Sequence, residues 1–382
     1  MSPAQTIAEV ETLLQRGDLV RAGELIRSMR WGSPQWSPPL RLQALLWLLE
    51  GKRDAAMAEI SRLALTNDPE NRIWHDVACF YSGQQAEAFT ASEFLGQVAV
   101  KRLRHSPYID FPAEVHIETL TACNAKCSFC PYPKLERLGN RMSDDLIDKI
   151  IGDLESIPRD LPFALSPFKV NDPLIDKRIF NICTEINHRL PSARLRLFTN
   201  GSPLTDSVIE RIARIEHLEH LWISLNEYLP DTYFSIMGIP LERTLKRLDR
   251  LHQAVESGFP HPIIISRVRD RTTNDESFVN FIRQRYPRFA ITVMPYANWA
   301  QQVPSMESLP VPANGCVRWF ELSIMSTGKV ALCCMDGEGR HVIGDISTQT
   351  VLDIYNSPDY RRLRESVESR KNADFPCNRC AI

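Results

Sequence analysis

The sequence predicts an α/β protein built on a parallel sheet, preceded by an all-helical region and followed by a small cysteine-bearing region of mixed helix and strand. Short β-rich runs alternate with amphipathic helical patterns over residues 111–305, which is typical of parallel α/β sheets. Residues 1–104 instead carry a repeating helical pattern, and residues 306–382 contain five of the ten cysteines. We therefore expect three domains with these bounds.

The N-terminal region repeats a helical unit. Gly17, Gly51 and Gly83 fall between helical patterns, and an alanine follows each of them five residues later. Pro34 and Pro69 end successive units. A period near 34 residues with a small residue after a turn glycine resembles tetratricopeptide helix pairs. The resemblance implies a surface for a peptide or a protein partner, while a cap that only covers the next domain is an equally good interpretation.

Six β-rich runs predict the strands of the central sheet. They lie at residues 115–120, 163–168, 194–198, 220–225, 262–268 and 290–294. Ligands of parallel α/β proteins bind at the carboxyl ends of the strands. Cysteines and polar side chains that directly follow these runs are therefore candidate site residues.

Three cysteines follow the first β-rich run. Cys123, Cys127 and Cys130 lie in Thr-Ala-Cys-Asn-Ala-Lys-Cys-Ser-Phe-Cys. Three thiolates on one loop can hold three corners of a four-iron four-sulfur cluster and leave the fourth iron open to another molecule. Structural zinc prefers four protein ligands, and disulfide frameworks are typical of small secreted domains. The spacing favours the cluster, with zinc or inert thiols as alternatives.

The spacing Cys-x3-Cys-x-Phe-Cys after a first strand resembles the radical S-adenosylmethionine (SAM) superfamily. The resemblance implies a partial (β/α)6 barrel in which Cys123, Cys127 and Cys130 hold a 4Fe-4S cluster that binds SAM. It also implies reductive cleavage of SAM to a 5′-deoxyadenosyl radical, which takes a hydrogen atom from the substrate. Phe129 would lie near the adenine, with ordinary loop packing as the alternative.

The same resemblance suggests polar SAM contacts after the second and third strands. Asn171 and Asp172 precede Pro173 where the family usually has Gly-Gly-Glu-Pro, so one of them would hold the ammonium of SAM. A turn built from Asn, Asp and Pro is the alternative. Thr199 and Asn200, which precede a glycine, resemble the Thr-Asn-Gly turn of the family, although a turn role alone would explain them.

Later strands supply further candidates. Ser224 and Asn226 follow the fourth strand, and their donors and acceptors match ribose hydroxyls or the carboxylate of SAM. Arg267, near the end of the fifth strand, would place a cation beside a carboxylate, with an ordinary ion pair as the alternative. Asn298-Trp299 after the sixth strand resembles an Asn-Trp pair at the active-site mouth of related enzymes, although packing explains the tryptophan slightly better.

The C-terminal region carries a second cysteine pattern. Cys316 is followed by Gly328 and Cys333, and then by the distant pair Cys377 and Cys380. This order resembles SPASM and twitch extensions, which hold auxiliary iron-sulfur clusters. The count favours one auxiliary 4Fe-4S cluster with these four cysteines as ligands. Zinc in a four-cysteine site is the alternative, and a shift of one residue would exchange Cys333 for Cys334.

Two local patterns accompany these cysteines. Ser326-Thr327-Gly328 predicts a hairpin turn that returns the chain toward Cys316, and residues 355–370 predict a helix.

Composition limits the partners and the compartment. The 45 Lys and Arg residues nearly balance the 47 Asp and Glu residues, so charge recruits neither nucleic acid nor an anionic membrane. The sequence shows no apolar signal stretch after Met1 and no run long enough to cross a bilayer. Ten cysteines in a chain expected to assemble clusters favour the cytoplasm.

These observations predict a radical enzyme. A fully ligated auxiliary cluster can only move electrons, so we expect oxidation (dehydrogenation) of a small polar metabolite or natural-product precursor, with flavodoxin or ferredoxin as the electron donor. The alternatives are an epimerase, in which a thiol or a tyrosine (Cys334, Cys183 or a residue not identified from the sequence) returns a hydrogen atom, and a maturase of ribosomal peptides. A third alternative is a non-catalytic helical-repeat scaffold with zinc-bound cysteines.

Overall fold

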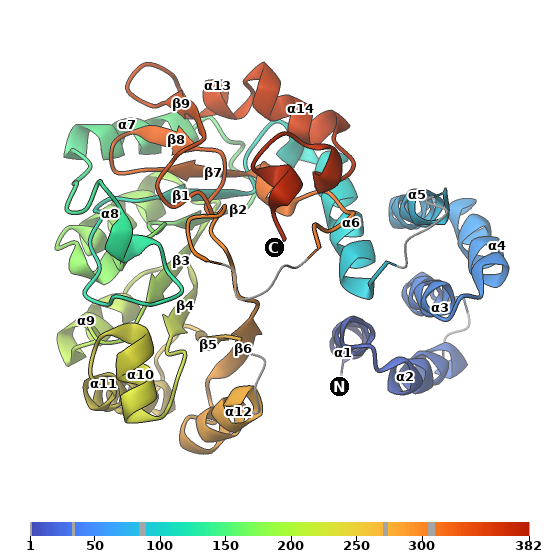
Figure 1. The fold of residues 1–382 in the computed structure, drawn as a ribbon, viewed down its shortest axis with the longest axis horizontal. Helices are drawn as coiled ribbons and strands as arrows, with labels where there is room; N and C mark the ends of the chain where they lie inside the picture. Colours follow the sequence, from blue (N-terminus) through green and yellow to red (C-terminus); the bar gives the residue numbers. More distant parts are fainter. Residues whose placement is uncertain (1, 33–34, 84–88, 270–273, 305–309, 382) are drawn as a thin grey trace. The chain divides into compact units, whose positions relative to one another are not determined.

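The computed structural model describes residues 2–32, 35–83, 89–269, 274–304 and 310–381. The chain packs as two compact units (Figure 1). The first, here called the helical unit, comprises Met1–Ser106, Pro312–Val317 and Val367–Ala373. The second, the sheet unit, comprises Pro107–Val311, Arg318–Ser366 and Asp374–Ile382. The division into three domains stays a prediction.

The helical unit is built from consecutive α-helices, each of which packs against the next. They are α1 (Pro3–Arg16), α2 (Leu19–Gly32), α3 (Ser37–Leu49), α4 (Arg53–Ala64), α5 (Pro69–Gly83) and α6 (Ala91–Arg104). Gly17 and Gly51 have positive φ angles of 78° and 77°, which glycine adopts without a steric penalty. The turns predicted at these two glycines are therefore confirmed, whereas Gly83 is the last residue of α5.

Small and apolar side chains fill the core of this unit. Ala22 and Ala56, which follow the two turn glycines by five residues, are fully buried together with Ile26 and Ile60. Pro34 and the alanine after Gly83 lie outside the described residues. The helical region is thus confirmed, and its tetratricopeptide identity remains a prediction.

Two later segments complete the helical unit. Gly315 N donates to Gln97 Oε1 at 2.8 Å, and Lys101 Nζ donates to Glu368 Oε1 at 2.9 Å. Arg104 also pairs with Glu368. Residues more than 260 positions apart in the sequence are joined in this way.

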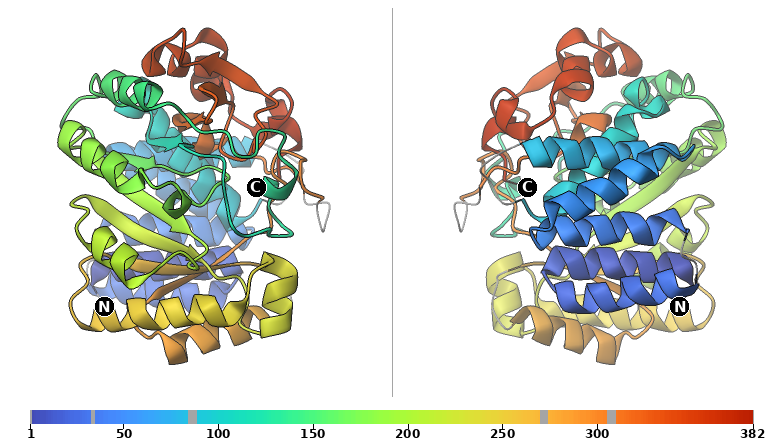
Figure 2. Two further views of the ribbon diagram at one scale, coloured as in Figure 1. Left: turned by 90° about the vertical axis from the view of Figure 1, so that its left-hand side faces the viewer. Right: turned by 90° about the vertical axis from the view of Figure 1, so that its right-hand side faces the viewer.

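The sheet unit contains all six predicted strands as parallel neighbours. They are β1 (Glu114–Ile117), β2 (Phe163–Ser166), β3 (Ala193–Thr199), β4 (Leu218–Ser224), β5 (Ile263–Val268) and β6 (Ala290–Met294). The connecting helices cover the outside of the sheet (Figure 2): α7 (Asp144–Leu154), α8 (Ile179–Arg189), α9 (Asp206–Ala213), α10 (Pro230–Met237), α11 (Leu241–Glu256) and α12 (Asn274–Arg285). This arrangement confirms the predicted α/β class and is consistent with a partial barrel.

The C-terminal strands extend the same sheet. They are β7 (Glu321–Ile324), β8 (Lys329–Ala331) and β9 (Val342–Asp345), and the sheet order is β6-β5-β4-β3-β2-β1-β7-β8-β9. Strand β7 is parallel to β1, and β8 is antiparallel to β7. Gly328 has a φ of 86° between β7 and β8, which confirms the predicted hairpin turn. The parallel pairing of β7 with β1 was not predicted.

The helix predicted at residues 355–370 is wrong in its bounds. Helix α13 (Val351–Tyr355) ends early, and α14 (Pro358–Ser366) begins at a proline. Proline has no backbone N–H and disfavours a helical conformation of the residue before it. The chain therefore starts a new helix at Pro358 instead of continuing the old one.

One face of the sheet carries an unusual polar row. His116 pairs in register with Ser166 on β2 and with Ser323 on β7, and Arg196 on β3 pairs with His220 on β4. Parallel sheets covered on both faces are usually apolar throughout. This row departs from that pattern.

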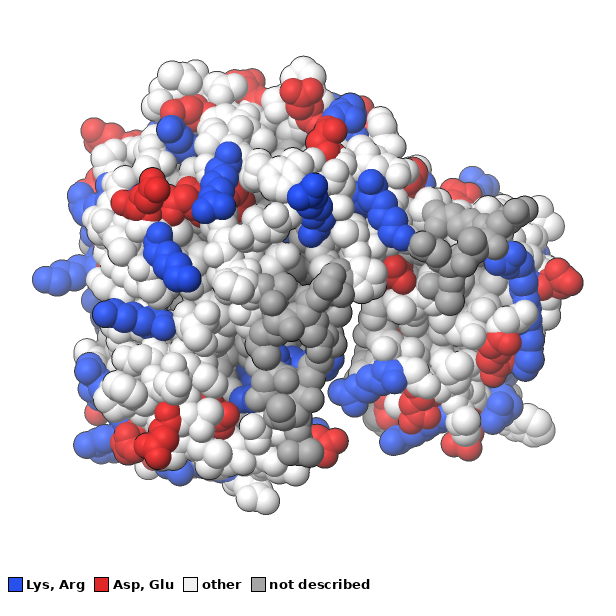
Figure 3. Space-filling model, viewed as in Figure 1, with Lys and Arg blue, Asp and Glu red and all other residues white. Residues whose placement is uncertain are grey.

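The surface charge agrees with the balanced composition. Basic and acidic side chains are interspersed over the visible face of each unit (Figure 3). No helix in the described part of the chain combines the length and the apolar character needed to cross a bilayer.

Candidate active site

The three cysteines lie on an irregular loop between β1 and α7. This loop contains one short 3-10 turn, η2 (Tyr132–Lys134). The backbone N–H groups of Lys126 and Ser128 donate to the carbonyls of Met237 and Ile236, each at 2.9 Å. The end of α10 therefore holds the cysteine loop in place.

All three thiols line one cavity of about 130 Å³. The other predicted site residues that line it are Phe129, Asn171, Asp172, Thr199, Asn200 and Ser224. These residues come from the cysteine loop and from the ends of β2, β3 and β4. The structure thus brings together, at the carboxyl ends of parallel strands, most of the residues expected around SAM.

The thiols of this cavity favour bound metal. No disulfide joins them. Burial, helped by the charge of Asp172, raises the pKa of Cys123 to about 12, and burial raises the pKa of Cys130 to about 11. Free thiolates are therefore costly here, and iron bound in place of the protons would supply the missing positive charge. The donor set fits a cluster held at three corners.

Asn171 and Asp172 have different environments. Asn171 Oδ1 accepts from Lys169 N at 2.9 Å, while the buried Nδ2 has no hydrogen-bond partner among the described residues. An unpaired buried donor is costly, so this atom fits a ligand acceptor such as a carboxylate oxygen. Asn171 is thus better suited to the carboxylate of SAM than to its ammonium.

Asp172 organises the neighbouring turn. Its Oδ2 accepts from Thr199 Oγ1 at 2.9 Å and from Asn200 N at 3.0 Å, and its Oδ1 accepts from Leu174 N at 3.1 Å. Burial raises the pKa of Asp172 to about 6, against the effect of these hydrogen bonds. Asn200 in turn directs Nδ2 toward Cys123 Sγ at 3.9 Å. Asp172 therefore fixes side chains that touch the cavity.

Asn226 and Arg267 are not among the residues that line the cavity. Arg267 is 1% exposed and contacts Glu227 Oε2 at 3.3 Å and Asp275 Oδ1 at 2.8 Å. Asn226 Oδ1 accepts from Val268 N at 2.9 Å. A buried guanidinium requires anionic partners, and here the protein supplies them itself. These contacts match the alternative interpretation of Arg267 as part of an ordinary ion pair, and its contact with a ligand carboxylate stays a prediction.

Several cavity residues were not predicted as site residues. Phe168 and Phe198 stack with ring centroids 4.8 Å apart and form an apolar wall beside Lys169. Trp299, for which packing was the slightly favoured interpretation, also lines the cavity and donates its Nε1 to the carbonyl of Phe129 at 2.9 Å. The sequence feature that could have identified these residues as part of the site was their position at or after the ends of predicted strands.

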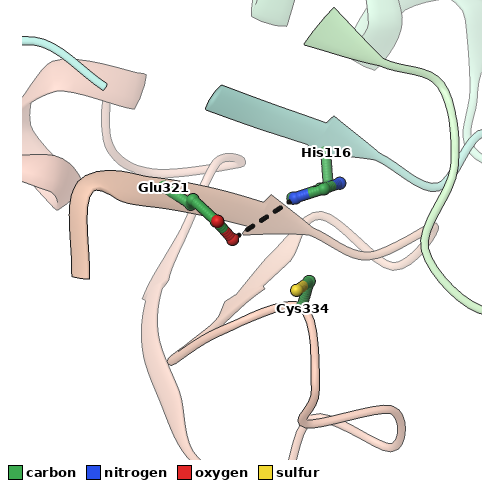
Figure 4. Close-up of side chains that lie close together, drawn as sticks. All are labelled: His116, Glu321 and Cys334. Atoms are coloured by element: carbon green, nitrogen blue, oxygen red, sulfur yellow. Dashed lines mark ion pairs between the residues drawn. The ribbon is translucent and has the colours of Figure 1, made fainter. Parts of the chain in front are cut away.

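A second group of side chains joins β1, β7 and the loop after β8 (Figure 4). His116 Nε2 lies 3.4 Å from Glu321 Oε2, and Arg318 Nη1 donates to Cys334 Sγ at 2.6 Å. Burial would lower the pKa of His116, but its contacts with Cys334 and Glu321 raise it to about 10. Burial would raise the pKa of Glu321, but the charge of Arg318 lowers it to about 2. We interpret the group as a set of paired charges.

The auxiliary cysteines are divided between the units. Cys316 belongs to the helical unit, and Cys333, Cys377 and Cys380 belong to the sheet unit. Cys377 and Cys380 are joined by one 3-10 turn, η6 (Cys377–Arg379), in which Cys380 N donates to the carbonyl of Cys377 at 3.1 Å. Four cysteine sulfurs are a donor set that suits an iron-sulfur cluster.

Family models match two parts of the chain. Residues 117–283 match the radical SAM superfamily, and residues 316–381 match SPASM, an iron-sulfur cluster-binding domain. The chain thus contains a radical SAM domain and a SPASM domain. The radical SAM domain implies a 4Fe-4S cluster and SAM, and the SPASM domain implies auxiliary iron-sulfur clusters. None of the curated proteins matches the sequence.

Solved structures share the fold. SuiB of Streptococcus suis bound to the precursor peptide SuiA has a TM-score of 0.54 at 14% identity, over 88% of this chain and 83% of that one. SuiB bound to SAM has a TM-score of 0.53 at 15% identity, over 82% and 78%. BtrN in complex with SAM and 2-DOIA has a TM-score of 0.48 at 14% identity, over 71% and 94%. Identities this low show the fold alone.

Proposed function

We propose that this radical SAM enzyme abstracts a hydrogen atom from a small polar metabolite or natural-product precursor and completes its oxidation (dehydrogenation). The observation that carries the proposal is one cavity lined by Cys123, Cys127 and Cys130 and by the unpaired amide of Asn171. The three thiols would hold a cluster that, when bound, would provide the electron for reductive cleavage of SAM to a 5′-deoxyadenosyl radical. The protein supplies position and exclusion of water.

The side chains around the cavity divide this work. The three thiols would hold the cluster, and Asn171 Nδ2 would donate to the carboxylate of SAM. Asp172 keeps Thr199 and Asn200 in place through its carboxylate. Phe129 and Ser224 line the same cavity and are proposed to contact the nucleoside. The stacked pair Phe168 and Phe198 would keep water from a reactive substrate.

The remaining electron of an oxidation needs an acceptor. We propose that Cys316, Cys333, Cys377 and Cys380 hold the auxiliary cluster that fills this role. Cys333 is proposed as the ligand because its spacing from Cys316 and Gly328 matches the SPASM pattern, and Cys334 Sγ accepts from Arg318. A flavodoxin or ferredoxin would reduce the cluster held by the three thiols. The proposed compartment is the reducing cytoplasm.

A ribosomal peptide is the second candidate substrate. It is favoured by one comparison, because the structure of SuiB with its precursor peptide aligns with 88% of this chain. The helical unit is a proposed site for such a partner. For an epimerase, neither Cys183 nor Cys334 is among the residues that line the cavity, whereas Tyr132 is. The radical SAM and SPASM matches favour an enzyme over the zinc-scaffold alternative.

Anaerobic reconstitution tests the proposal. Protein loaded with iron and sulfide should bind about eight irons per chain, as expected for two 4Fe-4S clusters. With dithionite and SAM it should form 5′-deoxyadenosine. The variant with Cys123, Cys127 and Cys130 changed to alanine should keep about four irons and form none. Product formation by this variant would contradict the proposal.

Deuterium transfer identifies the reaction. Candidate substrates labelled at single carbons should pass deuterium to 5′-deoxyadenosine when the label marks the reacting position. A product lighter by two hydrogen atoms, without solvent hydrogen at that carbon, indicates oxidation. Solvent hydrogen returned to the carbon indicates epimerisation and would overturn the dehydrogenase proposal.

A further inference from the structure

Lys169 connects the SAM cavity to the auxiliary-cysteine segment. It follows β2, lines the cavity and is 1% exposed. Its Nζ donates to Ser323 Oγ on β7 at 2.9 Å. The same nitrogen lies 3.3 Å from the carbonyl oxygen of Cys333 and 3.5 Å from that of Cys334. One side chain thus spans from the end of β2 to the loop that follows β8.

The hydrogen-bond partners of this ammonium are all neutral. A hydroxyl and two carbonyls satisfy its three N–H groups but offer no opposite charge. Burying an ammonium without a compensating anion is costly. An anionic group bound at Cys333 would therefore compensate the charge of Lys169.

An iron-sulfur cluster with four thiolate ligands would supply such charge. Its reduction potential depends on net charge, on hydrogen bonds and on nearby dipoles. A fixed cation close to a cysteine ligand stabilises the more negative, reduced state. It therefore raises the potential and makes the cluster a better electron acceptor.

We propose that Lys169 is a positioning residue that anchors the Cys333-Cys334 segment to the end of β2 and whose charge raises the reduction potential of the cluster held through Cys333. The inference rests on the proposed auxiliary site and not on the identity of the substrate. It links the cavity that binds SAM to the group that would accept the electron of an oxidation.

The test measures the potential of the auxiliary cluster. The full chain with Cys123, Cys127 and Cys130 changed to alanine is reconstituted, so that only the auxiliary cluster contributes to the electron paramagnetic resonance signal. Redox titrations then compare this protein with the same protein carrying Lys169→Met, which removes the charge, or Lys169→Arg, which keeps it. Lys246→Met on α11 is the control, since it removes an exposed lysine charge.

We expect Lys169→Met to lower the potential, and Lys169→Arg and Lys246→Met to keep it. Equal potentials for the Met variant and its parent, or equal shifts for Met and Arg, would overturn the proposal. If the Lys169→Met variant fails to hold iron, Lys169→Gln replaces it, because glutamine keeps N–H donors without the charge. An unchanged potential for Lys169→Gln would also overturn the proposal. Failure of the wild-type protein to form 5′-deoxyadenosine would contradict the proposed function. The potential of the auxiliary cluster could still be measured in the same way, so the two tests are separate.

Discussion

Neighbouring residues in this protein do different work because their side chains have different partners. Asn171 keeps an unpaired N–H at the cavity, whereas the carboxylate of Asp172 is used by Thr199, Asn200 and Leu174. The sequence showed that polar side chains follow β2. It did not show which of their atoms would accept hydrogen bonds from backbone N–H groups. That distinction depends on the packing of the β2 and β3 ends.

Asn171 gives a direct prediction for SAM affinity. Asn171→Ala should weaken SAM binding to the reconstituted protein by about 10- to 100-fold, because a hydrogen bond to a charged acceptor contributes roughly 1.5–3 kcal/mol. Calorimetric titration measures the change. Asn181→Ala, on α8 and outside the cavity, is the matched control. Equal affinities for wild type and Asn171→Ala would exclude the assigned contact.

The two adjacent cysteines after β8 give a second prediction. Cys333→Ser should lower bound iron by about four atoms per chain, whereas Cys334→Ser should leave it unchanged, since a 4Fe-4S cluster requires its cysteine ligands. Iron and sulfide analysis after reconstitution distinguishes the two variants. The reverse pattern would show that the sulfur near Arg318 is the ligand.

At the scale of elements, the sequence predicted the strands whose formation depends on neighbouring residues, but not the pairing of strands that are distant in the sequence. The six barrel strands are rich in β-branched and aromatic residues and were found where expected. Strand β7, Glu-Leu-Ser-Ile, gives a weak signal, and its parallel pairing with β1 joins residues about 200 positions apart. The sequence did not identify the ion-pair partner of Arg267 for a related reason, because that partner, Asp275, lies on α12.

The turn after β3 gives a prediction about stability. Gly201 has a φ of 82°, and a Cβ there would lie 3.1 Å from Ile223 Cγ2. Gly258 has a φ of 102° but nothing within 4 Å of such a Cβ. Each change to alanine should cost about 1–2 kcal/mol in backbone strain. Gly201→Ala should cost roughly 1 kcal/mol more through crowding, measured by urea unfolding, and equal losses would contradict this reasoning.

At the scale of the whole molecule, the units are not continuous in sequence. Residues 312–317 and 367–373 leave the sheet unit and pack with the helices. Charge and hydrogen bonds attach them, since Glu368 meets Lys101, Arg104 and Gln97. Nothing in the local sequence of these segments indicates this placement, which depends on partners more than 200 residues away.

Glu368 should make the stability of the helical unit depend on pH. Burial would raise its pKa, but Lys101 and Arg104 lower it below the ordinary value. Its contribution is therefore present above the unfolded pKa of 4.5 and is lost as pH falls through the folded value. Glu368→Gln should lower stability near neutral pH by about 1 kcal/mol, and the difference should shrink in acid.

Thermal unfolding followed by circular dichroism measures this difference at several pH values. Glu365→Gln is the control, because Glu365 forms an exposed ion pair with Arg361, and exposed pairs contribute little. A pH-independent difference for Glu368→Gln would argue against the assigned ion pairs.

The support that α10 gives to the cysteine loop has a consequence for biosynthesis. The amides of Lys126 and Ser128 need the carbonyls of Met237 and Ile236, which the ribosome adds more than 100 residues later. Until then the three sulfur atoms belong to a nascent chain without a finished pocket. We therefore expect iron loading to follow the synthesis of α10 and the thiols of the unfinished chain to need a reducing environment until then.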